Sequence, residues 1–331
     1  MSRIAVLGAG SWGTALAVHL GRAGHDVVLW GRDAALVEEI AHTRRNPTYM
    51  SSMTLPPSVR ADARFATALA DAAFVVVAVP SHGLRAVVQA ARAALPAGAT
   101  IVSATKGLEA ESLLRMSEVI DQELGGRHPV TVLSGPSFAL EVARGLPTAV
   151  LVASRDSEAA SQVQHEFRAA YFRLYASDDV IGVELGGAVK NVIAIAAGVV
   201  EALGLGHNAL AGLITRGLAE TSRLACAAGG RRETLAGLSG LGDLVVTCTG
   251  SLSRNRWLGS ELGRGRSLAS ILSGMKMVAE GVKTTDAALA LGARFGIELP
   301  IAAQMGQVLT GRTDPKTAVE ALMLRPQRAE G

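Results

Sequence analysis

Cysteine is scarce in this sequence of 331 residues, which contains only Cys226 and Cys248. Two isolated cysteines provide neither a disulfide framework nor the clustered ligands of a zinc site, so we expect no bound metal. The same scarcity is typical of proteins from a reducing compartment, and we expect this chain to be cytoplasmic. Aromatic residues make up only 4% of the chain, and no interleaving of aromatic and basic residues indicates a nucleic-acid groove.

The sequence also lacks a strong charge of either sign. Its 32 Lys and Arg residues are nearly balanced by 29 Asp and Glu residues, which leaves a net charge of +3 at pH 7. We therefore expect no nucleic-acid partner, whereas a small anionic ligand fits the modest positive excess. The longest candidate for a membrane segment, residues 192–200, is far too short to cross a bilayer, so we expect no membrane span.

The most informative segment is a glycine motif close to the N-terminus. A short apolar run, residues 4–7, is followed by Gly8, Gly10 and Gly13 and then by a helical pattern over residues 14–23. In this strand-turn-helix context, Gly8 permits the tight turn and Gly10 lets the backbone approach a pyrophosphate. Gly13 lets the helix pack closely on the strand, and the N–H groups at the helix start face the phosphates. The motif predicts a dinucleotide-binding fold.

The remaining pattern divides the chain into two parts, as its length and its 49% hydrophobic content allow. Short β-branched runs alternate with helical stretches in the first part, and the expected strands are residues 3–7, 27–30, 74–79, 100–103, 130–134, 148–153 and 172–175. The expected helices between them include residues 34–42, 84–94 and 112–124. This alternation predicts an α/β, Rossmann-like domain over residues 1–180, with a doubly wound and mostly parallel sheet. Residues 181–331 read as helical throughout, so we expect an all-α domain there and a ligand site in the crevice between the two domains.

The tip of the second strand bears on the choice of dinucleotide. NAD-binding versions of this fold usually have an acidic residue there, but this chain has Gly31 followed by Arg32 and Asp33. Arg32 could accept the 2′-phosphate of NADP(H), which we favour over NAD(H), although use of both stays open. The alternative is that Arg32 is an ordinary solvated side chain and that Asp33 caps the helix of residues 34–42.

Polar residues follow several other strands at the same expected sheet edge. Lys106 follows the strand of residues 100–103, and Gly135 and Ser137 follow the strand of residues 130–134. His82, after the strand of residues 74–79, is either an acid/base group or simply the start of the next helix.

Two positions in the helical part are candidates for chemistry. Lys190 and Asn191 interrupt an apolar helix, so the lysine either extends to the surface or faces a polar cavity. A buried lysine has a lowered pKa and suits a general base. Arg254 and Asn255 provide the planar cation and neutral donor that suit a phosphate. The alternative, which charge alone does not exclude, is a solvated loop between helices.

Six segments together resemble the bacterial NAD(P)-dependent glycerol-3-phosphate dehydrogenase family. In chain order they are GAGSWGTALA, SATKGLE, LSGPSFALEVARGLPTAV, VELGGAVKNVIAIAAG, GLGDLVVTCTGSLSRNRWLG and VAEGVKT. The resemblance extends from about residue 3 to residue 322 at family-like spacing. It implies reversible reduction of dihydroxyacetone phosphate to sn-glycerol 3-phosphate, which supplies glycerophospholipid synthesis.

The resemblance also implies roles for individual residues. Lys190 would be the catalytic proton acceptor for the substrate hydroxyl, and the other substrate contacts would be Lys106, Gly135, Ser137, Asp243, Ser253, Arg254 and Asn255. The cofactor contacts would be Ser11, Trp12, Arg32, Ala139, Val278 and Glu280, in addition to the three motif glycines. Lys106 and Arg254 would touch both ligands. A homodimer through the helical domain is one arrangement that the sequence leaves open.

One region departs from the family pattern. Residues 49–56 lack the turn that usually precedes the Leu-Pro pair, so we expect a differently shaped loop near the adenosine, where contacts of Tyr49 are open. Two other functions are alternatives to the one implied. A dehydrogenase of 3-hydroxy acids or sugar acids would share this architecture, and a non-catalytic NADP-binding sensor would share the glycine motif but would not need Lys106, Lys190, Asp243 and Arg254 together.

The assignment of Arg32 gives a first testable prediction. Replacing Arg32 with alanine should shift the preference of the protein from NADPH toward NADH, because only NADPH carries the phosphate that Arg32 would contact. Steady-state kinetics with each cofactor measures this shift. Equal losses with both cofactors would show that Arg32 does not read the 2′-phosphate.

Overall fold

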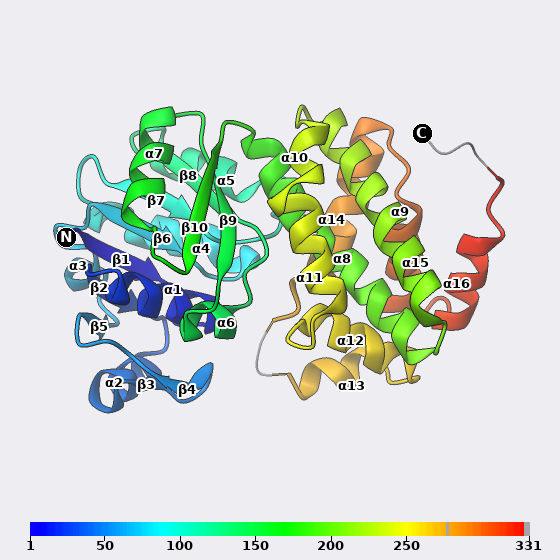
Figure 1. Ribbon diagram of the computed structural model, residues 1–331, viewed down its shortest axis with the longest axis horizontal. Coiled ribbons are helices and arrows are strands. Elements are labelled where there is room, and N and C mark those ends of the chain that lie inside the picture. The colour runs from blue at the N-terminus through cyan, green and yellow to red at the C-terminus, as the bar shows by residue number, and fades with distance from the viewer. Residues whose placement is uncertain (276–277, 328–331) are drawn as a thin grey trace.

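The computed structural model describes residues 1–275 and 278–327. Its N-terminal part is a sheet with helices packed on both faces, and its C-terminal part is a bundle of helices beside that sheet (Figure 1). The predicted class, a Rossmann-like domain followed by an all-helical part, is therefore confirmed. The sheet ends with β10 (Phe172–Ser177) and the first bundle helix, α8, begins at Val180. The predicted boundary at residue 180 coincides with this helix start, and the division into domains 1–180 and 181–331 stays a prediction.

The main sheet has eight strands in the order β10-β9-β8-β7-β6-β1-β2-β5. All neighbouring pairs are parallel except β8 with β9, so the sheet is mostly parallel as predicted. Besides β10, the strands are β1 (Arg3–Leu7), β2 (Asp26–Trp30), β5 (Val59–Asp62), β6 (Phe74–Val77), β7 (Thr100–Ser103), β8 (Val130–Ser134) and β9 (Thr148–Ala153).

Several element boundaries differ from those expected. The edge strand β5 and a small antiparallel pair, β3 (Arg45–Asn46) with β4 (Met50–Thr54), were not predicted, because their side chains are mostly polar or exposed. The strand predicted to end at residue 79 ends at Val77, since Pro80 lacks an N–H group and directly precedes a helix. The helix predicted from residue 84 therefore begins earlier, at Ser81.

Helices cover both faces of the sheet. On one face α1 (Ser11–Arg22), α6 (Ala139–Arg144) and α7 (Ser157–Glu166) contribute to one hydrophobic core, together with α2 (Ala34–Thr43). On the other face α3 (Phe65–Leu69), α4 (Ser81–Ala91) and α5 (Met116–Leu124) contribute to a second core. A single 3-10 turn, η1 (Arg92–Ala94), follows α4. The strands between these cores are buried on both sides, which explains their nearly continuous apolar sequences.

The helical part is built around α8 (Val180–Ala202), which is buried along almost its whole length. This helix is longer than the apolar run noted in the sequence, and its length and composition would allow it to cross a membrane. However, 94% of its most apolar window is buried inside the protein, so α8 is a core helix. The elements around it are α9 (Gly206–Ala227), α10 (Arg232–Ala236), the π-helical turn η2 (Leu238–Gly242), α11 (Asp243–Thr249), α12 (Arg254–Gly263), α13 (Leu268–Ser273), α14 (Glu280–Phe295), α15 (Pro300–Leu309) and α16 (Pro315–Met323).

Two glycines allow α8 and α12 to cross at very short distance. A Cβ atom at Gly198 of α8 would lie 1.9 Å from the carbonyl oxygen of Arg256, and one at Gly259 of α12 would lie 1.9 Å from the carbonyl oxygen of Ile195. Each helix therefore presents a bare backbone to the other at the crossing. This contact fixes the position of α12, which begins with Arg254 and Asn255.

A buried carboxylate joins the helical part to the sheet domain. Glu184 of α8 accepts hydrogen bonds from the backbone N–H of Ser117 at 2.8 Å and from its hydroxyl at 2.6 Å, at the first turn of α5. Arg115 donates to the same carboxylate at 2.6 Å. All three residues are buried, so the charges are compensated without water. This network fixes α8 against the domain that carries the glycine motif.

The crossing of α8 and α12 leads to a prediction about stability. Gly198→Ala should lower the free energy of unfolding by about 2–3 kcal/mol, because the added methyl group meets backbone rather than a movable side chain. Thermal and urea denaturation would measure the change. Gly212→Ala on α9 is the matched control, since no atom lies within 4 Å of its Cβ position, and it should be neutral or stabilise by up to about 1 kcal/mol. Similar losses in both variants would contradict the proposed close approach.

Candidate active site

The glycine motif forms a tight turn between β1 and α1. Gly8 has a φ of +121°, a conformation that favours glycine. A Cβ atom at Gly13 would lie 1.8 Å from the carbonyl oxygen of Gly8, whereas one at Gly10 would meet no atom within 4 Å. The turn is therefore closed at Gly13 and open at Gly10, where the motif predicts the approach of a pyrophosphate.

The start of α1 suits an anionic group. Gly10 occupies the N-cap position, where it provides no capping side chain, and the first turn of α1 contains no acidic residue. The positive end of the helix dipole is thus not neutralised locally. The indole nitrogen of Trp12 is buried without a hydrogen-bond partner in the described part of the chain, and the Ser11 hydroxyl donates to the carbonyl oxygen of Tyr49 at 3.2 Å. These features fit the dinucleotide that the sequence predicts.

Two lysines and one aspartate form the centre of the candidate site. Lys106, which follows β7, donates to Asp243 Oδ2 at 2.6 Å and to the carbonyl oxygen of Gly135 at 3.1 Å. Lys190 of α8 donates to Asp243 Oδ1 and to the hydroxyl of Thr247 at 2.9 Å. Only 1% of the Asp243 surface and 7% of the Lys190 surface are exposed. The structure thus brings together residues that the sequence placed on three separate segments, and Lys190 does not extend to the surface.

The surroundings of Lys190 adjust its acidity. Burial is the main cause that lowers the pKa of Lys190 from 10.5 to about 8; the positive charge of Lys106 acts in the same direction, and the Asp243 carboxylate opposes the shift. An amine with a pKa of about 8 exchanges a proton readily near neutral pH, as a general acid and base must. No side chain fits at Gly187, one turn before Lys190, because a Cβ atom there would lie 2.7 Å from Ser134 Oγ.

A chain of amide groups extends from Lys190 toward α12 and α14. Asn255 donates through Nδ2 to the side-chain oxygen of Asn191 at 2.9 Å and accepts from the backbone N–H of Gly281 at 3.0 Å. Ser253 caps α12 by accepting from the backbone N–H of Arg256 at 3.2 Å. Arg254 is exposed and makes no hydrogen bond or ion pair with any residue that the structure describes, so its guanidinium group is available to a ligand.

The remaining predicted residues lie between β8 and α6, at the start of α6 and around the start of α14. Ser137 donates to the carbonyl oxygen of Gly135 at 2.9 Å, and Ala139 is the first residue of α6. Val278 is half-buried before α14, and Glu280 at the start of that helix accepts from Ser81. No ligand contact of these residues is tested by the structure, so their roles stay predictions.

The structure also bears on the two open interpretations at the sheet edge. Asp33 accepts a hydrogen bond from the backbone N–H of Leu36 at 3.2 Å, which confirms that it caps α2. Arg32 is exposed and forms no hydrogen bond within residues 1–275 and 278–327, so it is accessible to a phosphate or to solvent. His82 is the second residue of α4, as expected for a helix start, and it lies outside the cluster around Lys190.

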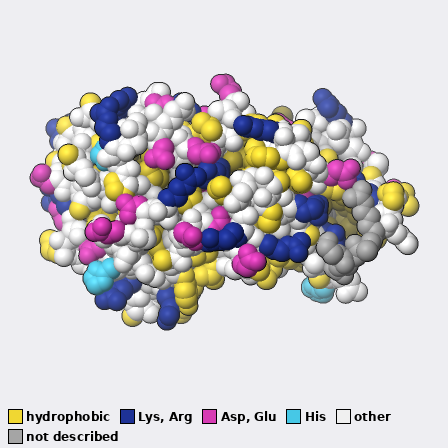
Figure 2. All heavy atoms as spheres, turned by 90° about the horizontal axis from the view of Figure 1, so that it is seen from above, with side chains coloured by type: hydrophobic (Ala, Val, Ile, Leu, Met, Phe, Trp, Pro, Cys, Tyr) yellow, Lys and Arg dark blue, Asp and Glu magenta, His cyan; other side chains and the backbone are white. Residues whose placement is uncertain are grey.

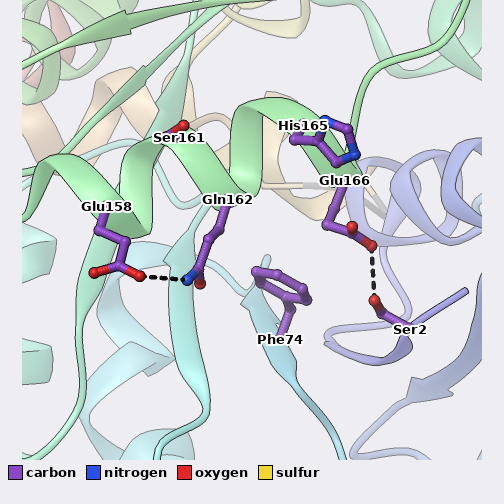
Figure 3. Close-up of a pocket in the computed structure, with 7 residues that line it drawn as sticks. All are labelled: Ser2, Phe74, Glu158, Ser161, Gln162, His165 and Glu166. Atoms are coloured by element: carbon purple, nitrogen blue, oxygen red, sulfur yellow. Dashed lines mark hydrogen bonds between the residues drawn. The ribbon is translucent and has the colours of Figure 1, made fainter.

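A separate pocket of about 410 Å³ lies away from these residues (Figure 3). It is lined by Ser2, Phe74, Glu158, Ser161, Gln162, His165 and Glu166. Ser2 precedes β1 and Phe74 begins β6, so the pocket lies at the amino ends of parallel strands. The Lys190 cluster lies beyond the carboxyl ends, where ligands of such sheets bind. None of the predicted site residues lines this pocket.

Sequence reasoning missed part of the local architecture. Thr247 was not assigned a role, although it follows Asp243 by four residues and therefore lies on the same face of α11. Asp243 was expected as a substrate contact, and the structure shows that both of its oxygens are occupied by lysines. Asn191 had been noted beside Lys190 but not as a partner of Asn255. Helical spacing could have indicated Thr247, whereas the pairing of Asn191 with Asn255 depends on the tertiary fold.

A glycine turn at the carboxyl end of β1, together with a buried lysine of lowered pKa in the helical part, is typical of dehydrogenases that use a nicotinamide cofactor. Comparison with known proteins gives the particular family. The chain matches the models of the NAD-dependent glycerol-3-phosphate dehydrogenase N-terminus over residues 3–160 and C-terminus over residues 179–320. It therefore belongs to this family, and it is an oxidoreductase that acts on a CH–OH group.

Individual relatives agree over the full length. The chain is 53% identical to a glycerol-3-phosphate dehydrogenase (NAD(P)+) of Acidobacterium capsulatum, with 100% of each chain covered. It is 50% identical to the protein of the same name from Koribacter versatilis, with 100% of this chain and 99% of that one covered. The crystal structure of glycerol-3-phosphate dehydrogenase from Coxiella burnetii aligns with a TM-score of 0.94 at 41% identity, over 98% of this chain and 99% of that chain.

The pKa of Lys190 predicts the pH dependence of the reaction. With Lys190 as the proton acceptor that the sequence predicts, oxidation would need its neutral amine, so kcat/KM for glycerol 3-phosphate should fall as the pH falls below about 8. Because the Asp243 carboxylate raises this pKa, Asp243→Asn should move the falling limb by about one to two pH units toward lower pH. Initial rates of the wild-type protein and of the variant, measured between pH 6 and 10 in steps of about one-half pH unit, would locate the falling limb of each. A limb that stays in place or moves to higher pH would contradict the assigned coupling.

Proposed function

We propose that Lys190 is the general acid and base of the reaction of this enzyme, which interconverts dihydroxyacetone phosphate and glycerol 3-phosphate. The observation that carries this proposal is the buried amine of Lys190, with a pKa lowered to about 8 and fixed between Asp243 and Thr247. When bound, the nicotinamide cofactor accepts or supplies the hydride at C2 of the substrate. The residues of the chain supply proton transfer, orientation and charge.

In the reduction direction, Lys190 as an ammonium donates a hydrogen bond to the substrate carbonyl oxygen and then transfers its proton there. In oxidation the neutral amine takes the proton from the C2 hydroxyl. Thr247 accepts from Lys190 at 2.9 Å and therefore restricts the direction in which the amine points. One proton moves between Lys190 Nζ and the substrate oxygen, toward the substrate in reduction and toward the amine in oxidation.

Lys106 and Asp243 support this transfer electrostatically. Lys106 places a second positive charge near the oxygen that becomes an alkoxide, and in a water-poor site this charge is effective. Asp243 holds both lysines and prevents the two cations from separating. The aspartate acts through the lysines, and it is a positioning residue in this proposal.

The phosphate of the substrate is proposed to bind at the start of α12. Arg254 provides a free guanidinium group, and Asn255 lies beside Asn191 at the same end of the cleft. The Ser253 side chain already caps the helix, so its hydroxyl can contribute only the hydrogen bond that it still has to donate. Binding energy from the phosphate would orient the remote carbonyl carbon against the cofactor.

For the cofactor, we propose the glycine turn as the pyrophosphate site and Arg32 as the residue that reads a 2′-phosphate. The open space at Gly10 and the uncapped start of α1 support the first assignment. The absence of an acidic residue at position 31 and the exposed guanidinium of Arg32 support a preference for NADP(H) over NAD(H). Supply of glycerophospholipid synthesis follows from the product, while the cytoplasmic location and a homodimer stay predictions.

The experiment that tests the proposed base uses Lys190→Met. Loss of the proton donor should lower kcat by about 10²–10⁴-fold while binding of NADPH, measured by fluorescence titration, changes little. The assay follows nicotinamide absorbance with NADPH and dihydroxyacetone phosphate, and with NADH in parallel.

Lys316→Met is the matched control, because Lys316 is an exposed lysine on α16 outside the site. The control should keep wild-type turnover. Near wild-type turnover of Lys190→Met would exclude Lys190 as the base. If the wild-type protein binds NADPH but consumes none with dihydroxyacetone phosphate, the substrate assignment is wrong and 3-hydroxy acids become the next candidates.

A further inference from the structure

The carboxyl ends of three adjacent strands bring residues from separate segments to one edge of the sheet. In the register of the sheet, Leu7 at the end of β1 pairs with Trp30 of β2 on one side and with Val77 of β6 on the other. Arg32 follows β2 after one residue, and His82 lies in the first turn of the helix after β6. The glycine turn therefore lies between Arg32 and His82.

The helical domain reaches the same edge through the first turn of α14. Glu280 accepts a hydrogen bond from the Ser81 hydroxyl at 2.6 Å and another from the Ser81 backbone N–H at 3.3 Å. These bonds hold the start of α14 against the start of α4. Lys283 follows Glu280 by three residues, which places both side chains on the same face of α14. A cation of the helical domain is thus directed toward the edge that carries Arg32 and His82.

The three basic side chains have no acidic partner of their own. Arg32, His82 and Lys283 are all exposed, and none of them makes a hydrogen bond or ion pair with the residues described here. Partial burial lowers the pKa of His82, Lys283 and Arg32 lower it further, and Glu280 opposes them. Both cations therefore act on the same imidazole, one from each part of the chain.

The acidic groups nearby already accept hydrogen bonds from residues at helix starts. Asp33, next to Arg32, accepts from Leu36 as the cap of α2. Glu280 accepts twice from Ser81. Each carboxylate is therefore turned toward a helix N-terminus, where it is stabilised by the helix dipole. Positive charge from Arg32, Lys283 and, when protonated, His82 stays available for an anion in the cleft.

We propose that Lys283 and His82 act with Arg32 to bind the 2′-phosphate of NADP(H), so that both domains hold this one group. The proposal rests on the proposed function of Arg32 and extends it across the cleft. A phosphate monoester carries close to two negative charges at neutral pH, and a single exposed arginine gains little from it in water. Two or three converging cations provide the additional charge-assisted hydrogen bonds that discrimination against NADH requires.

Two ligands that differ only by the phosphate in question test the proposal. We would titrate the full-length protein with 2′,5′-ADP and with 5′-ADP by calorimetry, using wild type, Lys283→Ala and His82→Gln. Lys283→Ala should weaken 2′,5′-ADP binding by about five- to tenfold, and His82→Gln by about two- to threefold, while 5′-ADP binding changes less than about twofold.

Arg294→Ala is the matched control for net charge. It removes the same positive charge from an exposed position near the other end of α14, so it should leave both affinities unchanged. A loss of 2′,5′-ADP affinity in Lys283→Ala that is no larger than in Arg294→Ala, or an equal loss for both nucleotides, would overturn the proposal.

The Arg32→Ala variant separates failure of this proposal from failure of the proposed cofactor preference. If Arg32→Ala loses the preference for 2′,5′-ADP and Lys283→Ala keeps it, Arg32 reads the phosphate alone and the present inference is wrong. If the wild-type protein binds the two nucleotides equally, both the NADP preference and the shared phosphate site are wrong. If Arg32→Ala and Lys283→Ala both lose affinity for 2′,5′-ADP but not for 5′-ADP, the NADP preference and the shared phosphate site are both supported.

Discussion

The structure of the site depends on one carboxylate, Asp243, which is buried between two lysines. Lys106 belongs to the sheet domain and Lys190 to the central helix of the bundle, so the aspartate links the two parts at the proposed active site. Without Asp243, two positive charges would face each other in a region from which water is largely excluded, and such repulsion is costly. The same arrangement leaves a net positive charge beside Asp243. That charge is useful because both the substrate and its alkoxide-like transition state are anionic.

Three further carboxylates, two of them buried and that of Glu280 half-buried, join elements that are distant in sequence, each at a helix N-terminus. Glu184 binds the first turn of α5, Glu280 binds that of α4, and Glu220 accepts from the backbone N–H groups of Ile301 and Ala302 at the start of α15. In each case the carboxylate gains hydrogen bonds from N–H groups that have no partner within their own helix. Lys and Arg side chains on the molecular surface are, by contrast, interspersed with Asp and Glu on the face drawn in Figure 2.

The sequence was sufficient to predict the mostly parallel sheet, the helical second half and several of the segments that meet around Asp243. The buried strands were clear because their apolar runs are continuous, and the glycine motif fixed the first turn. The polar edge strand Val59–Asp62 was missed because it lacks such a run. Sequence alone left open whether Lys190 faced the surface or a cavity, since that depends on helices that follow much later. It also did not predict that Asp243 binds both lysines, because the partners lie 137 and 53 residues away along the chain.

The position of α8 has a consequence for how the chain folds during synthesis. The sheet domain can form as soon as its strands have left the ribosome, because its cores are made from the first half of the chain. By contrast, α8 emerges as a long apolar segment whose covering helices, including α14 and α15, are translated near the end. Until then the apolar surface of α8 is exposed to solvent, where it can aggregate or be bound by chaperones that recognise apolar segments. Completion of the bundle is thus a late and non-local step, and Lys190 becomes buried only when it occurs.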